Sequence, residues 1–221
     1  MFVRETRQAR GWLRFLQPGN SATGAGCRPS HPSSMPAGAA DSDRADVERV
    51  LAGEVDAFAG IVERWQRPLI NLAYRFCGDA ARAEDLAQEA FLRAFRRLHQ
   101  WRGDGAFSTW LFALALNVYR SGIKVEREVS VEAAAAPLVA PTAFDDAAAE
   151  DRREVVRRAV LTLPPRYRDA VIMFYFRDQD LAAAARCLGV PDGTLKARLH
   201  RGRSLLRAKL ARTLGLDPAA G

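Results

Sequence analysis

The sequence predicts an all-α protein made of two small helical domains. Two long stretches carry apolar residues at spacings of three and four, which is the period of an amphipathic helix. They are separated by a segment rich in alanine, proline and acidic residues. Neither stretch contains the alternating Val, Ile and Thr runs, bounded by turn residues, that indicate β-strands. At 221 residues with 48% hydrophobic residues, the chain is long enough to bury two small cores.

The residues before the first patterned stretch, 1–42, are rich in Gly, Pro, Ser, Ala and Arg, and we expect them to form a disordered N-terminal extension. They contain no apolar region followed by a small-residue cleavage site, so no secretory signal is predicted. Met35 lies just before the patterned region, which leaves open whether translation starts at Met1 or at Met35. No window approaches the ~18 consecutive apolar residues of a membrane-spanning helix, so we expect no membrane insertion.

The first domain is assigned to residues 43–124, where the pattern is helical throughout. Apolar residues at helical spacing over 58–76 predict one helix, which Gly78-Asp79 should end before capping the next. The sequence RGDGA at 102–106 interrupts the period again. Ser108 is then the candidate N-cap of a helix running through TWLFALALNVYR.

Charge is distributed unevenly along the chain. Residues 125–151 hold 1 basic and 7 acidic side chains, whereas residues 152–212 hold 15 Lys and Arg against 5 Asp and Glu. We therefore expect a flexible acidic linker over 125–150 and a strongly basic second domain. The pI near 9.9 and the net charge of +7 suit a polyanionic partner.

The second domain, 151–214, is expected to contain four helices and to be followed by a disordered tail at 215–221. The first two helices pass through VVRRAVLTL and YRDAVIMFYF and are separated by Pro164-Pro165. The third spans 180–188, and the fourth runs from Thr194 to about Leu214, with GVPDG forming the turn between them. Two helices joined by a short Gly-containing turn, the second presenting cations, are typical of a helix-turn-helix.

The fourth helix of this domain is both amphipathic and basic. Leucines share one face with Gly202, and Lys196, His200 and Arg201 lie on other faces. A solvated basic face on an ordinary bundle helix would look the same. A membrane-surface helix is disfavoured because the apolar face lacks Trp and Phe. DNA binding is the leading interpretation of this helix alone.

Two features of the first domain also suggest binding surfaces. Asp85, Gln88 and Glu89 share one polar face of a predicted helix, although any surface helix of mixed charge would show this pattern. The segment WRGDGAFSTWLFALALNVYR interleaves aromatic residues with cations. Such a segment suits unstacked bases, because bases stack on aromatic rings while cations follow the phosphates. The alternative is that Trp110 and Phe112 are simply core residues.

Metal, cofactor and enzyme sites are not indicated. The three cysteines, Cys27, Cys77 and Cys187, lie far apart without a CxxC pair, and the three histidines are widely separated. His200 therefore suits a polar contact better than a metal ligand. The chain contains no HExxH motif, no phosphate-binding Gly-rich loop and no histidine-backed nucleophile. We expect no cofactor, no metal and no enzymatic activity.

Four segments together resemble a known family. AEDLAQEAF, FRRLHQWRGDGAFSTWLFALALN, LPPRYRDAVIMFYF and LGVPDGTLKARLHRGRSLLRAKL occur in this order. They look like the two domains of the extracytoplasmic-function (ECF) group of bacterial RNA polymerase sigma factors, over roughly residues 46–124 and 152–212. The resemblance implies sigma domain 2 in the first half and sigma domain 4 in the second. It also implies a cytoplasmic, nucleoid-associated protein whose partners are core RNA polymerase, promoter DNA and an anti-sigma factor.

The resemblance further implies roles for individual residues. Contacts with core polymerase fall on Asp85, Gln88 and Glu89. Recognition of the minus-ten element and capture of a flipped base from the melted single strand fall on Arg102, Phe107, Trp110, Asn117, Arg120 and Lys124. Recognition of the duplex minus-thirty-five element falls on Thr194, Lys196, Ala197, His200, Arg201 and Arg203.

Some positions depart from the family pattern. Ala183 stands where the family usually has Glu, and Ala197 replaces a usual Ser, which removes a hydroxyl from the DNA-contacting face. Ser121 stands where Asp is common, and Gly202 where Ala is. These departures leave the preferred promoter sequence open.

The competing hypothesis from another functional class is a helix-turn-helix regulator that binds duplex operators without polymerase, but such a protein has no need of the aromatic segment at 102–120.

Overall fold

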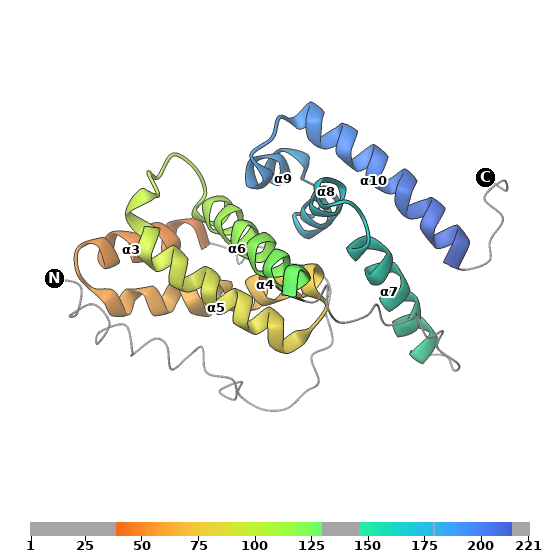
Figure 1. Cartoon of the computed structure of the whole chain (residues 1–221). Helices are drawn as coiled ribbons and strands as arrows, with labels where there is room; N and C mark the ends of the chain where they lie inside the picture. Colours follow the sequence, from red (N-terminus) through yellow and green to blue (C-terminus); the bar gives the residue numbers. More distant parts are fainter. Residues whose placement is uncertain (1–38, 130–145, 179, 214–221) are drawn as a thin grey trace. The chain divides into compact units, whose positions relative to one another are not determined.

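The computed structural model describes residues 39–129, 146–178 and 180–213, and the regular elements among them are all helices (Figure 1). In chain order these are α3 (Ala39–Leu51), the short 3-10 helix η2 (Val55–Ala57), α4 (Phe58–Cys77), α5 (Ala80–Arg97), the short 3-10 helix η3 (Leu98–Gln100), α6 (Phe107–Val129), α7 (Asp146–Leu161), α8 (Pro165–Phe176), α9 (Leu181–Leu188) and α10 (Asp192–Thr213). These residues form two compact units, with the main division between Tyr119 and Arg120 in α6. The predicted all-α class with two helical domains is confirmed.

The first unit is built around the apolar face of α4. The rings of Phe58 and Phe91 from α5 meet edge to face at 6.4 Å, and Trp65 meets Phe112 from α6 at 5.5 Å. The hydroxyl of Tyr119 in α6 donates a hydrogen bond to the carbonyl oxygen of Leu69 at 3.0 Å. The apolar residues spaced three and four apart in the sequence therefore form the core of this unit, as predicted.

Helix α3 is attached to α4 by a buried carboxylate. Asp43 is 1% exposed and accepts hydrogen bonds from the indole Nε1 of Trp65 and from Nε of Arg64, both at 2.9 Å. Arg64 also pairs with Asp46. Gly60 permits this close approach, because a Cβ there would lie 2.7 Å from a carboxylate oxygen of Asp46. The helix begins at Ala39, four residues before the predicted start of the domain.

The predicted boundary between α4 and α5 is confirmed. Gly78 has a φ of +76°, which glycine adopts without strain, and it directly follows the end of α4. The carboxylate of Asp79 accepts a hydrogen bond from the backbone N–H of Arg82 at 2.7 Å and so caps α5.

The prediction for Ser108 is wrong. Helix α6 begins at Phe107, so Ser108 is its second residue and not its N-cap. The side chain is 1% exposed, and its hydroxyl has no hydrogen-bond partner among the described residues. Phe107, whose ring is buried between Trp101 and Trp110, is already part of the helix, so the polar residue that follows it is too late to be the cap.

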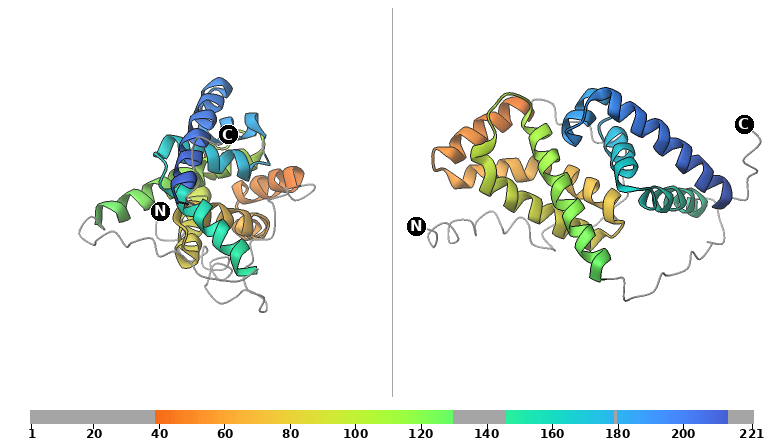
Figure 2. Two further views of the ribbon diagram at one scale, coloured as in Figure 1. Left: turned by 90° about the vertical axis from the view of Figure 1, so that its right-hand side faces the viewer. Right: turned by 45° about the horizontal axis from the view of Figure 1, so that its top comes forward.

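The second unit contains the four predicted helices, and α10 packs against α7, α8 and α9 (Figure 2). Asp180 caps α9 by accepting a hydrogen bond from the N–H of Ala183 at 3.0 Å, and Gly189, with φ of +64°, ends that helix. Helix α10 begins at Asp192, so the last two residues of the predicted GVPDG turn are already helical. Gly202 lies in the contact with α8, where a Cβ would come within 3.1 Å of Val171.

The predicted linker is shorter at both ends than expected. Residues 125–129 continue α6, and residues 146–150 belong to α7. The remaining part, 130–145, lies outside the described residues, as do 1–38 and the tail from 214, so their predicted disorder remains a prediction. Over the ranges that are described, no helix is long and apolar enough to cross a bilayer.

Candidate nucleic-acid and polymerase interfaces

The segment between η3 and α6 places an exposed loop on a cluster of aromatic rings. Arg102 is exposed, and Gly103 adopts a φ of +77° with open space around it. Beneath the loop the ring of Trp101 meets Phe107 edge to face at 5.5 Å, and Phe107 lies 5.4 Å from Trp110. The loop thus combines a cation and accessible backbone with two tryptophans, both of which are partly exposed.

The ring of Phe107 belongs to the core. It is 2% exposed, so in this conformation a base cannot stack on it, and its position between Trp101 and Trp110 makes it a support for them. Trp110 is partly exposed, so the core interpretation holds for part of its surface only. Trp101 was missed by sequence reasoning. The available signal was an aromatic residue immediately before the Gly-containing RGDGA segment.

The remaining residues of the predicted minus-ten set lie further along α6. Asn117 is exposed and lies ten residues beyond Phe107, which corresponds to ~15 Å along the helix axis. Trp110 and Asn117 are seven residues apart and therefore share one face of α6. The side chain of Lys124 lies outside the described residues. Arg120 is partly exposed and lies one turn beyond Asn117. Within the first unit, the predicted residues from Arg102 to Asn117 form a stripe that starts at the loop and follows α6, and not a single pocket; Arg120 belongs to the second unit.

The predicted polymerase-binding residues lie on the outer side of α5. Asp85 is exposed, and Gln88 and Glu89 are partly exposed, whereas the neighbouring Leu86 and Ala90 are buried. The carboxylate of Glu89 accepts a hydrogen bond from Arg93 at 3.0 Å. An exposed pair of this kind contributes little to stability, so both side chains can exchange partners at low cost.

The residues predicted to contact the minus-thirty-five element are all exposed on α10, and they occupy two edges of the helix. At ~100° per residue, Thr194, Ala197 and Arg201 lie on one edge, which we call the outer edge. Lys196, His200 and Arg203 lie about a third of a turn away, on what we call the groove edge. The third side of the helix is buried through Leu195, Leu199 and Gly202. The cations that the sequence places away from the leucines therefore fall into two groups on the helix.

The family departures also have structural consequences. Ala183 is 1% exposed in α9, and the N-terminus of that helix is capped by the Asp180 carboxylate, so the helix does not need an acidic side chain at Ala183 for its cap. Ala197 is exposed on the outer edge, where its methyl group offers no hydrogen bond to a partner.

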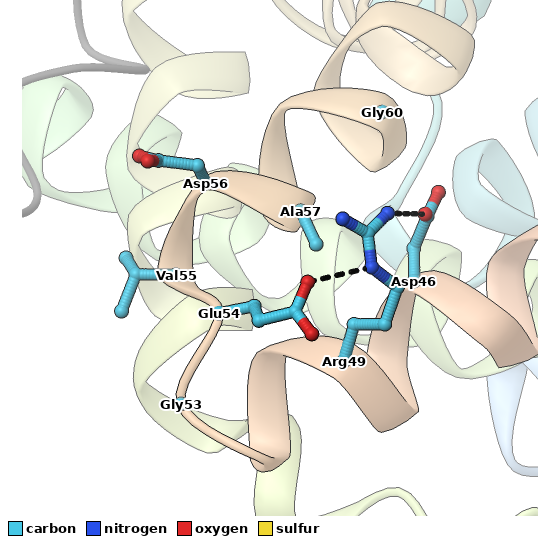
Figure 3. A pocket seen from close by; sticks show the side chains of 8 residues that line it. All are labelled: Asp46, Arg49, Gly53, Glu54, Val55, Asp56, Ala57 and Gly60. Carbon is cyan, nitrogen blue, oxygen red and sulfur yellow. Dashed lines mark hydrogen bonds and ion pairs between the residues drawn. The ribbon is translucent and has the colours of Figure 1, made fainter.

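A hollow of about 520 Å³ lies beside α3 and η2 (Figure 3). Its lining includes Asp46, Arg49, Glu54 and Asp56, and Arg49 donates to Glu54 at 2.8 Å and lies 3.8 Å from Asp46. With three carboxylates and one cation, this hollow is unsuited to nucleic acid.

Metal and nucleophile chemistry is not indicated for the described ranges. They contain no group of three or more His, Cys, Asp and Glu side chains arranged to hold a metal ion. Cys187 is buried in α9, and burial raises the pKa of its thiol, which disfavours the reactive thiolate.

Together, these features define the class of protein: a helix-turn-helix protein with an exposed cationic recognition helix and a second helical unit that presents aromatic and cationic side chains. Residues 61–128 match the family model for sigma-70 region 2, and residues 153–206 match the model for sigma-70 region 4. The ECF RNA polymerase sigma factor SigW of Bacillus subtilis is 31% identical over 176 residues, which cover 74% of this chain and 94% of SigW. The RNA polymerase sigma-H factor of Pseudomonas aeruginosa is 31% identical over 182 residues, covering 75% of this chain and 92% of that protein. The chain belongs to the ECF group of RNA polymerase sigma factors.

Solved structures show the same fold. CnrH, in complex with the cytosolic domain of CnrY, superposes with a TM-score of 0.59 at 23% identity and covers 78% of this chain and 99% of CnrH. The sigma factor RpoE from Bartonella quintana, in complex with the anti-sigma factor NepR, superposes with a TM-score of 0.53 at 20% identity, covering 70% of this chain and 97% of RpoE.

Proposed function

We propose that this chain is a dissociable promoter-specificity subunit that binds core RNA polymerase, directs it to specific promoters and helps to open the DNA. The observation that carries this proposal is that one chain presents two different surfaces whose chemistry suits DNA. Helix α10 presents cations suited to duplex DNA, and the loop before α6 presents tryptophans suited to unstacked bases. A protein that only bound duplex operators would have no use for the second surface.

The outer side of α5 is the proposed contact with core polymerase. The carboxylates of Asp85 and Glu89 and the amide of Gln88 project from a helix whose opposite side is anchored in the core. Such a rigid acidic face suits a basic partner surface through complementary charge.

The loop at 102–106 and the stripe along α6 are the proposed site of strand opening. Flipping a base out of the duplex costs a few kcal/mol, which stacking and cationic contacts must offset. Trp101 and Trp110 supply the stacking surface, and the Asn117 amide can donate to and accept from a base edge. Arg102 and Lys124 supply charge for the phosphates. Arg120 joins them by exchanging its hydrogen bond to the carboxylate of Asp169, which is 2.7 Å long.

Helix α10 is the proposed contact with the minus-thirty-five element, with Arg201 on the outer edge as the main base-contacting residue. An arginine can form two hydrogen bonds with a guanine, whereas Ala197 can only make apolar contacts.

We further propose that an anti-sigma factor regulates this protein, as the complexes of CnrH with CnrY and of RpoE with NepR suggest. We also propose that it acts without enzymatic activity of its own, in the cytoplasm at the nucleoid.

The test is reconstituted transcription. The purified chain is added to core polymerase with fragments of the source genome, and transcripts are mapped to select a promoter. Initiation at a restricted set of start sites, dependent on the added chain, is the expected result. Tight binding of duplex operators by the chain alone, without stimulation of core polymerase, would support the competing helix-turn-helix regulator instead.

A further inference from the structure

The hollow beside α3 and η2 shares no residue with the surfaces proposed for DNA and for core polymerase (Figure 3). Four of its lining residues are small or apolar, namely Gly53, Val55, Ala57 and Gly60, and the other four are the charged residues described above. Its volume of about 520 Å³ falls within the ~300–1,000 Å³ range of ligand-binding cavities. A segment that carries both cations and apolar side chains has the chemistry to fill it.

Two carboxylates at the hollow are available to a new partner. Glu54 pairs with Arg49 at 2.8 Å, but these side chains are 59% and 56% exposed, so the pair can exchange partners at low cost. Asp56 is exposed and forms no ion pair with any residue of the described ranges. Asp46, by contrast, is held by Arg64 and is only 17% exposed. A cation that enters the hollow therefore meets Glu54 and Asp56.

The part of the chain that forms the hollow stands out by its charge. Residues 39–57 hold six acidic and two basic side chains. Each α-helix from α4 to α10 is neutral or basic over its own length. This includes α5, which carries the proposed polymerase contact and has three acidic and four basic side chains. Among the described ranges, a basic segment is therefore attracted most strongly to the hollow.

The first residues of the chain have the opposite charge. Residues 1–38 hold five arginines and one glutamate, with no lysine and no aspartate. Four of the arginines fall within residues 4–14, at spacings of three, three and four, and Trp12 and Phe15 lie beside them. This segment combines cations with apolar side chains, so its chemistry matches that of the hollow.

The segment is attached where it can reach the hollow. It precedes Ala39, the first residue of α3, and that helix is ~20 Å long from Ala39 to Leu51. Residues 17–38 separate the arginines from α3, and a chain of this length can span up to ~70 Å. The arginines are thus tethered within reach of the hollow, which favours a contact inside one chain over a contact between two chains.

We propose that residues 4–16 dock in this hollow, where arginines of the segment pair with Glu54 and Asp56 and an apolar side chain packs against Val55. The contact joins two parts of one chain and does not depend on the proposed promoter function. Its consequence is that four arginines are held on a carboxylate-bearing surface. Released arginines would bind DNA phosphates without sequence preference.

The first test locates the segment by zero-length cross-linking of the full chain. Residues 1–38 contain no lysine, so Arg7→Lys, Arg10→Lys and Arg14→Lys, made one at a time, each add one side-chain amine to the segment and keep its charge. A carbodiimide joins an amine to a carboxylate only where the two groups touch. At low protein concentration, mass spectrometry of the digest should find the new lysine linked to Glu54 or Asp56.

The second test measures release of the segment by the rate of trypsin cleavage after its arginines. Glu54→Gln combined with Asp56→Asn should raise this rate by about 5- to 25-fold, the effect of losing one or two exposed ion pairs. Glu48→Gln is the matched control, because Glu48 is an exposed carboxylate of the same helix that pairs with Arg44 and does not line the hollow. Its cleavage rate should equal that of wild type, as should the circular dichroism of both variants.

The third test detects the released arginines on DNA. The double variant Glu54→Gln with Asp56→Asn should bind duplex DNA of random sequence more tightly than wild type and with a steeper salt dependence. Replacing the four arginines of residues 4–14 by glutamine should abolish this increase, because nothing is then left to release. An increase that persists without the arginines would come from the lost carboxylates alone and would contradict docking.

Other outcomes would overturn the proposal as well. Links from the new lysines only to Asp85 or Glu89 would place the segment on α5, and links only to acidic residues of 125–151 would place it on the predicted linker. Equal cleavage rates in wild type and the double variant would show that the segment is not held by these carboxylates. Intact-mass measurement of the native protein gives a further check, because a chain that starts at Met35 lacks the segment.

Discussion

Replacing Asp43 by alanine should detach α3 from the first unit. The carboxylate is 1% exposed and accepts hydrogen bonds from Trp65 and Arg64. Without it the buried indole N–H of Trp65 loses its partner, which costs ~1–3 kcal/mol. Arg64 keeps Asp46 as a partner, and its side chain is 21% exposed. Losing the hydrogen bond between Arg64 and Asp43 therefore adds only about 1 kcal/mol. We therefore expect a destabilisation of ~2–4 kcal/mol, a large part of the ~5–15 kcal/mol that stabilises a typical domain.

The assay is urea unfolding of the full chain, followed by circular dichroism, together with hydrogen exchange of the α3 amides. Glu48→Ala is the matched control, because it removes a carboxylate from the same helix that pairs with Arg44 in an exposed position. Its effect should stay within ~0.5 kcal/mol. If Asp43→Ala is no more destabilising than Glu48→Ala, the buried carboxylate does not anchor α3.

The pH dependence of stability tests the same site. Burial raises the pKa of Asp43 above its ordinary value of 3.8, against the opposing hydrogen bonds from Trp65 and Arg64. The folded state therefore binds more protons here than the unfolded state between the ordinary and the raised pKa, so this group's contribution to stability falls as pH rises through that interval. Asp43→Asn keeps an acceptor but cannot ionise. Its stability relative to wild type should rise with pH over the same interval, and a constant difference would contradict the raised pKa.

Three further predictions concern the proposed binding surfaces. The double reversal Asp85→Arg with Glu89→Arg should weaken association with core polymerase by more than about 100-fold while circular dichroism stays unchanged, because two exposed carboxylates become cations facing a basic partner; normal retention on immobilised core enzyme would refute the assignment. Asn117→Ala should slow strand opening roughly tenfold with little effect on the closed complex, because its proposed DNA contact is with an unpaired base, and permanganate reactivity of promoter thymines measures this; equal loss of both steps would contradict it. Arg201→Ala should cost ~1–3 kcal/mol of promoter affinity and relax the preference at one base pair, as judged by binding to a set of single base-pair variants; a uniform loss across that set would instead assign Arg201 to the phosphates.

The sequence alone determined the class of fold and the position of most helices. Apolar residues spaced three and four apart mark the side of a helix that faces the core, and this spacing can be read from one short stretch of the sequence. The cap at Asp79 and the glycine that ends α9 are likewise local, because each acts on a backbone N–H or φ angle within three residues. The resemblance of four segments to ECF sigma factors, which the relatives confirm, also needed only the order of residues.

Only the tertiary structure decided which candidate side chains are available to a partner. Phe107 and Ser108 are buried, although their types suggested a base contact and a cap. The packing of α10 against α8 decides which side of that helix is buried, and the aromatic rings beside the Arg203 guanidinium come from residues almost thirty positions earlier. Asp43 and Trp65 are 22 residues apart in the chain. Contacts over such separations depend on how whole helices pack, and the periodicity of a single segment carries no information about the neighbour that will cover it.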